Sequence, residues 1–353
     1  MKKIALYLSA ILLLASCYEI SVQTDDAQID INPMLATSTK ASSAGPIAGT
    51  TFDTGRTIWL SAYYTDAEST SHSQNYFTDI PYTYYSTSSK WAAGTQANPQ
   101  TKYWPSRGRM DFIALSREGT ASGWTGLSGI SHTGSNPAAS VTYVMPDNSS
   151  NQDDITASHC YDVNCAAHAP VPMEFKHLQA QVRFTARLAA AAYSGSYGIT
   201  VNSITLRRAR YSGTVTYTGS TGGISWSGVS SGTQTSVAAG TSDLNLSTTA
   251  VQYGKGIVLP EQSPTGSAGG IDVLIQYTLK TPEAKQLSYV YTIPATTWLP
   301  GKKYTYAFSF SLNEIVCSPT VTGWNDGGTE NITLPEADYL SFDILTGGVF
   351  LGN

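Results

Sequence analysis

Alternation of apolar and polar residues is the dominant pattern in this chain, and its longest run lies near the middle. From Leu178 to Leu188 every second residue is apolar, and the residues between them are polar. A period of two places the two sets on opposite faces of a β-strand, whereas a helix would scatter them around its surface. Met173, Phe175 and His177 have the opposite parity, which predicts a bulge or turn near His177–Leu178. A half-buried strand of this length requires a large antiparallel sheet around it.

The same pattern, interrupted by turns rich in Gly, Ser and Thr, predicts strands along the whole chain. Residues 27–35 form the first of them, and we expect it at the edge of a sheet because Pro33 has no N–H group to donate. Further strands are predicted at residues 56–64, 110–115, 141–144, 199–201, 204–206, 256–260, 271–277, 287–293 and 304–312. Short strands separated by turn residues are typical of antiparallel β-sandwiches.

Length and composition agree with an all-β protein of two domains. The 353 residues exceed what one sandwich usually needs. Charged residues make up only 13% of the chain, while Gly (31) and Tyr (22) are plentiful, which suits strands and turns better than helices. A polar stretch that ends in Pro170 and Pro172 has the composition of a domain boundary. We therefore divide the chain into residues 1–17, 18–165 and 166–353.

The charge of the chain gives no reason to expect a nucleic acid as partner. The formal net charge is −5 at pH 7. Arg207, Arg208 and Arg210 form a short and isolated basic cluster, which we interpret as a solvated strand end.

The first 17 residues have the regions of a targeting segment and are not expected to join the fold. Lys2 and Lys3 precede an apolar stretch, residues 4–14, which is too short to cross a bilayer comfortably. Leu14 to Cys17 (LASC) resembles the lipobox of bacterial lipoproteins, in which the cysteine receives a diacylglyceryl group. Because each buried methylene contributes about 0.8 kcal/mol, several acyl chains would hold the protein on the outer membrane. The alternative is an ordinary signal peptide with an incidental cysteine.

His159, Cys160, Cys165 and His168 form the one cluster of metal-ligand residue types in the sequence. Their spacing does not match the paired ligands of structural zinc sites, so no metal is expected. In an exported protein Cys160 and Cys165 either form a disulfide or remain two free thiols in a loop. Cys317 has no evident partner and is expected to be a small, buried apolar residue.

No arrangement of residues in the sequence points to catalysis or to a cofactor. The match to GxSxG at residues 228–232 lies in a run of Gly and Ser, without the strand and helix that a nucleophile elbow needs. His177 is expected to be a buried, hydrogen-bonded structural residue, because no carboxylate or nucleophile accompanies it. Trp91, Trp124, Trp226 and the tyrosines of residues 82–85 could stack on sugars if exposed, although most aromatic residues of a β protein belong to its core. We therefore expect a protein that is not an enzyme.

Two segments have features that suggest proteolysis in one case and strand pairing with another molecule in the other. Residues 36–51 are loop-like and contain one basic residue, Lys40, which is the kind of site that a trypsin-like protease cuts. Far along the chain, Leu340, Phe342 and Ile344 alternate with polar residues. An apolar strand at a free end either completes its own sheet or pairs with another molecule.

Several segments taken together resemble the fimbrillin-like proteins of Bacteroidetes, the subunits of type V pili. Their order and spacing match over residues 27–324, although each segment alone is weak. The segments are Tyr103 to Pro105 with residues 110–114, Phe175 to Val182, Val258 to Gln262, Trp298 to Tyr306 and Val321 to Trp324. The resemblance implies two transthyretin-like β-sandwich domains in tandem and export to the cell surface as a lipoprotein.

The resemblance also implies that the first strand can be removed. In polymerising members of the family a protease cuts after a basic residue and leaves a groove where the strand lay. Here the cut would follow Lys40, where better-known members have Arg. The released strand would be the first predicted one, whose apolar residues are Ile29, Ile31 and Leu35.

In that family the C-terminal strand of another subunit fills the groove, and here it would carry Leu340, Phe342 and Ile344. The implied partners are other pilus subunits, a processing protease and the outer membrane. The implied function is that of a shaft, tip or anchor subunit of an adhesive pilus, assembled by strand addition. The alternative is a surface lipoprotein that binds glycans through exposed aromatic residues.

Replacement of Cys17 by Ala should leave an unprocessed precursor without lipid, because the acyl-accepting sulfur is lost. Metabolic labelling with a fatty acid measures this directly in a host that makes lipoproteins. Ser16→Ala keeps the cysteine and a small residue before it, so this control should label like the wild type. Equal label in the Cys17→Ala chain would show that the lipid, if any, is attached elsewhere.

Overall fold

The computed structural model describes residues 24–35, 52, 54–66, 74–118, 130–133, 136–144, 149, 152–190, 198–219, 221–229, 234–263, 270–280, 283–311, 314–324 and 329–330. Strands dominate this part of the chain, which also contains the short 3-10 helix η2 (Cys165–Ala167). The all-β class expected from the alternating pattern is confirmed. Within the described residues, no helix has the length and apolar character that a membrane crossing requires.

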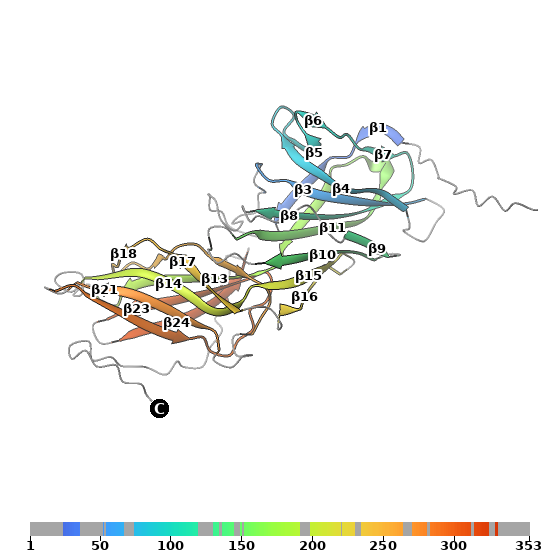
Figure 1. Ribbon diagram of the computed structural model, residues 1–353. Helices are drawn as coiled ribbons and strands as arrows, with labels where there is room; N and C mark the ends of the chain where they lie inside the picture. The colour runs from blue at the N-terminus through green and yellow to red at the C-terminus, as the bar shows by residue number, and fades with distance from the viewer. Residues whose placement is uncertain are drawn as a thin grey trace, which may run out of the picture.

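An eight-stranded sheet forms the first half of the fold (Figure 1). In spatial order its strands are β2 (Ile31–Leu35), β12 (Val171–His177), β11 (Asp154–Asn164), β8 (Arg109–Glu118), β3 (Ile58–Thr65), β4 (Gln74–Tyr85), β5 (Lys90–Thr95) and β6 (Asn98–Pro99). A separate two-stranded sheet consists of β1 (Thr24–Gln28) and β7 (Tyr103–Pro105). All neighbours in the large sheet are antiparallel except β2 and β12, which run in parallel.

This sheet curls until its two ends meet at β2. β2 pairs along its length with β12 and, through Ile31, with Trp91 of β5. The inner faces of the strands thereby enclose one apolar core. The largest fully buried side chains in it are Trp104, Tyr82, Phe112 and Phe175.

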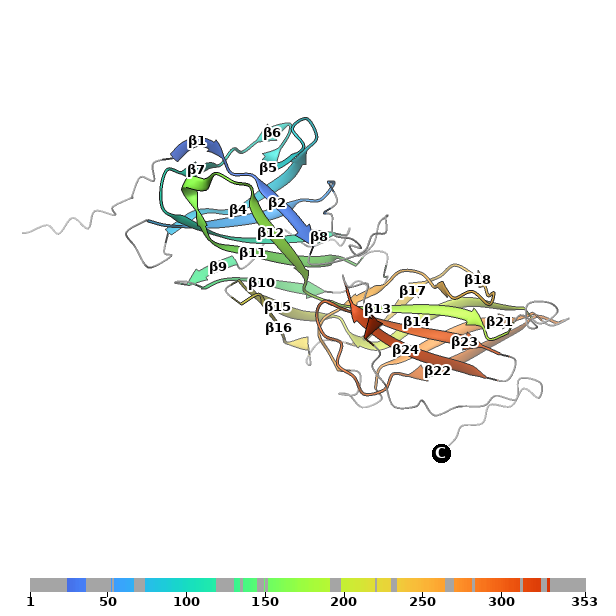
Figure 2. The same ribbon diagram turned by 180° about the vertical axis from the view of Figure 1, so that it is seen from behind.

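Two further sheets pack face to face as a β-sandwich in the second half of the chain (Figure 2). One contains β19 (Val251–Gln252), β13 (Ala180–Leu188), β23 (Lys302–Phe310), β24 (Ile315–Gly323) and β25 (Thr329–Glu330), with β20 (Ile257–Leu259) paired to β13. The other contains β17 (Gln234–Gly240), β14 (Ile199–Arg210), β21 (Asp272–Leu279) and β22 (Lys285–Thr292), with β18 (Leu244–Asn245) paired to β14.

The side-chain alternation predicted for the two longest amphipathic strands is present in this sandwich. The even-numbered residues of β13, and those of β23 from Tyr304 to Phe310, are buried, and they face the other sheet. Tyr277 of β21 lies 5.6 Å from Phe310 of β23, and Tyr291 of β22 lies 5.7 Å from Phe308, measured between ring centroids. Both pairs are edge-to-face, an arrangement that adds to the energy of burial.

A fifth sheet joins the two halves and lies between them in both views (Figures 1 and 2). It combines the hairpin of β9 (Ile130–Thr133) and β10 (Asn136–Val144) with the hairpin of β15 (Ser212–Thr218) and β16 (Gly223–Ser227). β10 and β15 are antiparallel neighbours, from Ala138 opposite Thr218 to Val144 opposite Ser212. Each half of the chain therefore supplies one hairpin to a shared sheet.

The outer face of the first sheet is buried as well. In β8, Phe112 and Ala114 face the first core, while Ile113 and Leu115 belong to the core that continues through β15 into the sandwich. Tyr217 of β15 is fully buried in that second core. A large apolar interface of this kind holds two domains in one relative position.

The chain passes from the first sheet to the sandwich where the slip in parity was predicted. β12 ends at His177 and β13 begins at Ala180. Between them, the buried side chain of Gln179 accepts a hydrogen bond from the N–H of Ile155 (2.8 Å) and donates one to the carbonyl of Asp153 (3.0 Å). The boundary suggested after residue 165 lies before β12, which still pairs within the first sheet. By sheet membership the change of domain falls after His177.

Replacement of Phe184 or Phe308 by Ala should lower the free energy of unfolding by about 3–5 kcal/mol, because each change leaves a cavity. Both rings are buried, and their centroids lie 6.3 Å apart in the sandwich core. Arg187→Ala is the control, since Arg187 lies on the exposed face of β13 and should change stability by no more than about 0.5 kcal/mol. Urea unfolding measures all three, and equal losses would contradict the orientation of β13.

Candidate functional site

The segment that sequence analysis marked as removable is fastened at two points before β2 begins. Ile29 donates its N–H to the carbonyl of Lys102 (2.8 Å), and the carbonyl of Asp30 accepts from the N–H of Val171 (2.9 Å). The Lys90 ammonium lies 2.7 Å from the Asp30 carboxylate. That lysine is largely exposed, so the ion pair adds little to stability. The backbone contacts position the chain so that it enters β2 beside β12.

β2 has one apolar face and one polar or exposed face. Ile31, Pro33 and Leu35 are buried, whereas Asn32 and Met34 are exposed. The contrast is sharpest at the end of the strand, where Leu35 is 3% exposed and Met34 is 41% exposed. Each fully buried aliphatic side chain contributes about 1.5–3 kcal/mol. The apolar face of β2 is therefore the main source of its attachment.

Aromatic rings surround this apolar face. Phe52, Trp91 and Phe175 belong to the same core as Ile31 and Leu35. The ring of Phe52 lies 4.5 Å from that of Phe175 and 6.1 Å, edge-on, from that of Trp91. We call β5, β12 and these three rings, with β2 between them, the β2 site. Its walls are apolar and suit any strand that presents an apolar residue at every second position.

The two sides of β2 are paired differently. Toward β12 all five residues have a partner, from Ile31 opposite Val171 to Leu35 opposite Phe175. Toward β5, Ile31 with Trp91 is the one pair formed by the described residues. β2, which was expected at the edge of a sheet, therefore lies between β12 and β5 at Ile31. From Asn32 to Leu35 its one partner among the described strands is β12. Pro33 falls in the second part, where a residue without an N–H group is tolerated most easily.

Sequence reasoning found the apolar residues of β2 but not the residues around them. Alternation marked Ile29, Ile31 and Leu35, and all three are buried. Phe52 belongs to a short segment outside the strands, and Trp91 belongs to β5, near the opposite end of the sheet from β2 in strand order. No local sequence pattern connects either residue with residues 31–35.

Several predicted site residues lie outside the described residues. These are the lipidation site Cys17, the cleavage site Lys40 and the donor-strand residues Leu340, Phe342 and Ile344. Their roles stay predictions.

His177 is buried and hydrogen-bonded as predicted, but a carboxylate does accompany it. Its Nδ1 lies 2.9 Å from Oδ1 of Asp154, and both side chains are 1% exposed. Its ring is stacked on Trp324, with 4.1 Å between the centroids. Pairing of β11 with β12 sets Thr156 opposite His177 and so brings Asp154 within reach. A pair buried so completely at the junction of the two domains fits a structural role.

The described cysteines are free thiols. Cys160, Cys165 and Cys317 have no disulfide partner in this part of the chain, so of the two alternatives for Cys160 and Cys165 the structure has the reduced pair. Burial raises the pKa of the Cys165 thiol to about 12 and also raises the pKa of Cys160. Both thiols are therefore protonated and poorly reactive near neutral pH. His159 is directed to β15, with its Nδ1 2.6 Å from the hydroxyl of Tyr217.

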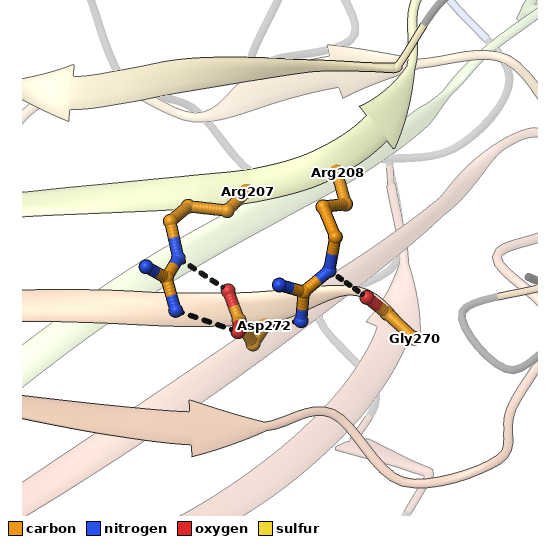
Figure 3. A network of polar contacts seen from close by, with 4 residues as sticks. All are labelled: Arg207, Arg208, Gly270 and Asp272. Atoms are coloured by element: carbon orange, nitrogen blue, oxygen red, sulfur yellow. Dashed lines mark hydrogen bonds and ion pairs between the residues drawn. The ribbon is translucent and has the colours of Figure 1, made fainter. Parts of the chain in front are cut away.

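Arg207 and Arg208 lie near the end of β14 and stay partly exposed, as interpreted from the sequence, but both side chains are also paired with Asp272 (Figure 3). Arg207 donates to the two carboxylate oxygens from Nε (2.6 Å) and Nη2 (2.7 Å), and Arg208 donates to one of them from Nη2 (2.6 Å). Arg208 also donates from Nε to the carbonyl of Gly270. Adjacent residues of a strand normally face opposite ways, but Arg208 has a φ of 64° at a bulge, which turns both guanidinium groups to one carboxylate.

The aromatic residues considered for glycan binding are largely committed to the fold. Tyr82 and Trp91 are buried in the first core. The Tyr85 hydroxyl lies 2.8 Å from the carbonyl oxygen of Ala93, while Trp124 lies outside the described residues. Burial removes the first two rings from contact with a soluble sugar.

Solved structures from two Bacteroides species share this fold. A candidate cell adhesion protein from Bacteroides uniformis is 17% identical, with a TM-score of 0.52, over 86% of this chain and 100% of that chain. A fimbrial protein from Bacteroides vulgatus is 14% identical, with a TM-score of 0.53, over 84% of this chain and 99% of that chain. At these identities the likeness shows a common fold.

The chain matches the fimbrillin-like family model over residues 36–324 and belongs to that family. The class is therefore that of surface-exposed pilus subunits, which are not enzymes. No curated protein sequence matches the chain.

Leu35→Ala should destabilise the protein by about 2–5 kcal/mol, because it empties part of the β2 site. Met34→Ala removes a side chain of similar size from the exposed face of the same strand and should cost no more than about 0.5 kcal/mol. Guanidinium unfolding of the uncut monomer measures both variants. Equal effects would contradict the placement of the apolar face of β2.

Proposed function

We propose that this protein is a structural subunit of an adhesive type V pilus and that it assembles by exchanging β2 for a strand of another subunit. The observation that carries the proposal is that a five-residue strand, with its apolar face buried, fills the opening between β12 and β5. Membership of the fimbrillin-like family supports the pilus role. Other subunits of the same pilus are the partners.

Cleavage after Lys40 would convert β2 from a covalent part of the domain into a bound peptide. It would then be held by the pairing of β1 with β7, by the ladder with β12 and by its buried side chains. Its departure would uncover the rings of Phe52, Trp91 and Phe175 and leave the edge of β12 unpaired. An exposed edge beside apolar pockets is the arrangement that accepts an added strand.

The segment with Leu340, Phe342 and Ile344 has the same two-residue period as β2. We propose it as the strand that a neighbouring subunit contributes. In the parallel register set by the bond from Val171 N–H to the Asp30 carbonyl, the nitrogen of Pro33 is turned away from β12, so the proline costs no hydrogen bond to β12. Residues 340–344 contain no proline and would offer one further N–H on the side of β5. A hydrogen bond made by that N–H would contribute about 0.5–1.5 kcal/mol net in favour of the incoming strand.

Cleavage after Lys40 would have a second consequence, because of where Cys17 lies in the sequence. Cys17 lies on the N-terminal side of Lys40, so cleavage would separate the folded domains from the lipid as well as from β2. A lipidated, uncut chain would remain on the outer membrane as an anchor. A cut chain would be free to enter the shaft or the tip.

A mixing experiment tests the exchange. A Lys40→Ala chain keeps β2 and residues 340–353, so it should donate a strand but accept none. A chain without residues 340–353, cut after Lys40, should accept a strand but donate none. Together they should form heterodimers and stop, because neither partner can extend the complex, while the cut wild type should form a ladder of polymers. Unheated SDS gels show the species, and N-terminal sequencing establishes the cut.

Two substitutions in the proposed donor strand provide the matched control. Phe342→Asp places a charge on the apolar face and should abolish polymers, whereas Ser341→Asp places the same charge on the other face and should leave most of them. Polymers formed by the truncated chain alone would show that residues 340–353 are not the donor. Folded partners that give no heterodimer would contradict strand exchange.

A further inference from the structure

Two positive charges on the outer face of the sandwich lack a counter-ion among the described residues. Arg183 lies on β13 and Lys303 on the neighbouring strand β23, both at positions that face away from the core. The Nε of Arg183 is buried without a hydrogen-bond partner. Burial lowers the pKa of the Arg183 guanidinium. Burial, and after it the charge of Arg183, lower the pKa of Lys303 to about 8.

An amide without partners lies beside these charges. Gln181 is fully buried, and neither its Nε2 nor its Oε1 has a hydrogen-bond partner in the described part of the chain. It is directly opposite Lys303 in the parallel pairing of β13 with β23, and it precedes Arg183 by two residues, so all three share one face. Gly256 packs against the amide, since a Cβ at that position would lie 2.7 Å from Gln181 Nε2. The amide is thus held in place without a bond of its own.

Elsewhere in the chain, two guanidinium groups are neutralised by a carboxylate. Arg207 and Arg208 share the carboxylate of Asp272. Arg187, on the same face as Arg183, is exposed and is hydrated instead. Arg183 and Lys303 are only partly accessible to water, and like charges close together oppose folding unless an anion lies between them.

We propose that Gln181, Arg183 and Lys303 form a binding site for a carboxylate group on the outer face of the second domain. The planar guanidinium of Arg183 can donate two parallel hydrogen bonds to the two oxygens of such a group. Lys303 supplies a second charge, and the Nε2 of Gln181 supplies a neutral donor. This site is distinct from the β2 site and does not depend on strand exchange.

The carboxylate can come from the chain itself or from a soluble acid. Residues 331–353 contain Glu336, Asp338 and Asp343 and no Lys or Arg. They follow β25, a strand of the same sheet as β13 and β23. Their charge is complementary to the site, and the experiment separates this source from an external one.

The reactivity of Lys303 toward an amine reagent reports on the site, because a bound carboxylate stabilises the charged and unreactive ammonium. The measurement uses the uncut chain and the same chain without residues 331–353, each with sodium acetate or with sodium chloride at equal ionic strength. Labelling of Lys303 is read from its peptide by mass spectrometry, with the exposed Lys90 as internal reference. Occupation should slow labelling about tenfold, which corresponds to one pKa unit.

If residues 331–353 supply the carboxylate, their removal accelerates labelling and acetate reverses the change. If a soluble acid supplies it, acetate slows labelling in the uncut chain and the truncation has no effect. Arg183→Gln should abolish either response and Arg187→Gln should preserve it, while circular dichroism shows that both variants are folded. The proposal is overturned if acetate has no effect on either chain, or if Arg183→Gln responds like the wild type.

Discussion

Closure of the first sheet by β2 is the contact on which the rest of the structure depends. The sheet curls around an aromatic core, and the two strands at its opening, β12 and β5, are bridged by five residues. β12 is covered on one edge by β2 and on the other by β11, and its last residue, His177, leads through residues 178–179 into the sandwich. A change at β2 therefore acts on a strand that is continuous with the second domain.

The side of the first sheet away from β2 is arranged differently. β8 is buried on both faces, by the first core and by the core shared with β15. The joint sheet of β10 and β15 covers this region, and at the junction His177 contacts Asp154 and stacks on Trp324. Replacement of one strand at the opening can thus proceed while the domains stay joined. This division is compatible with the strand exchange proposed above.

Polar and charged groups mark where the apolar scaffold needs specific partners. Gln179 satisfies the backbone at the passage between the domains, and Asp272 neutralises two arginines on the outside of the sandwich. Arg183 and Lys303 are also partly buried, but they interact with each other as like charges. Because of this contrast, we assign a ligand to Arg183 and Lys303 and a structural role to Arg207 and Arg208.

The sequence by itself determined the all-β class, the faces of the most regular strands and the family, but it missed β11, which lies in the polar stretch interpreted as a domain boundary. Alternation identified β13 and β23, placed the slip in parity before Ala180 and marked Ile31 and Leu35 as buried, because a period of two decides which side of a strand each residue occupies. It could not decide which strands become neighbours. The parallel alignment of β2 with β12, the rings of Phe52 and Trp91 around it and the carboxylate of Asp154 beside His177 all follow from pairings between distant segments. Only the tertiary structure decides these contacts, since the free energy of a sheet depends on how its strands pack together and not on the pattern within any one of them.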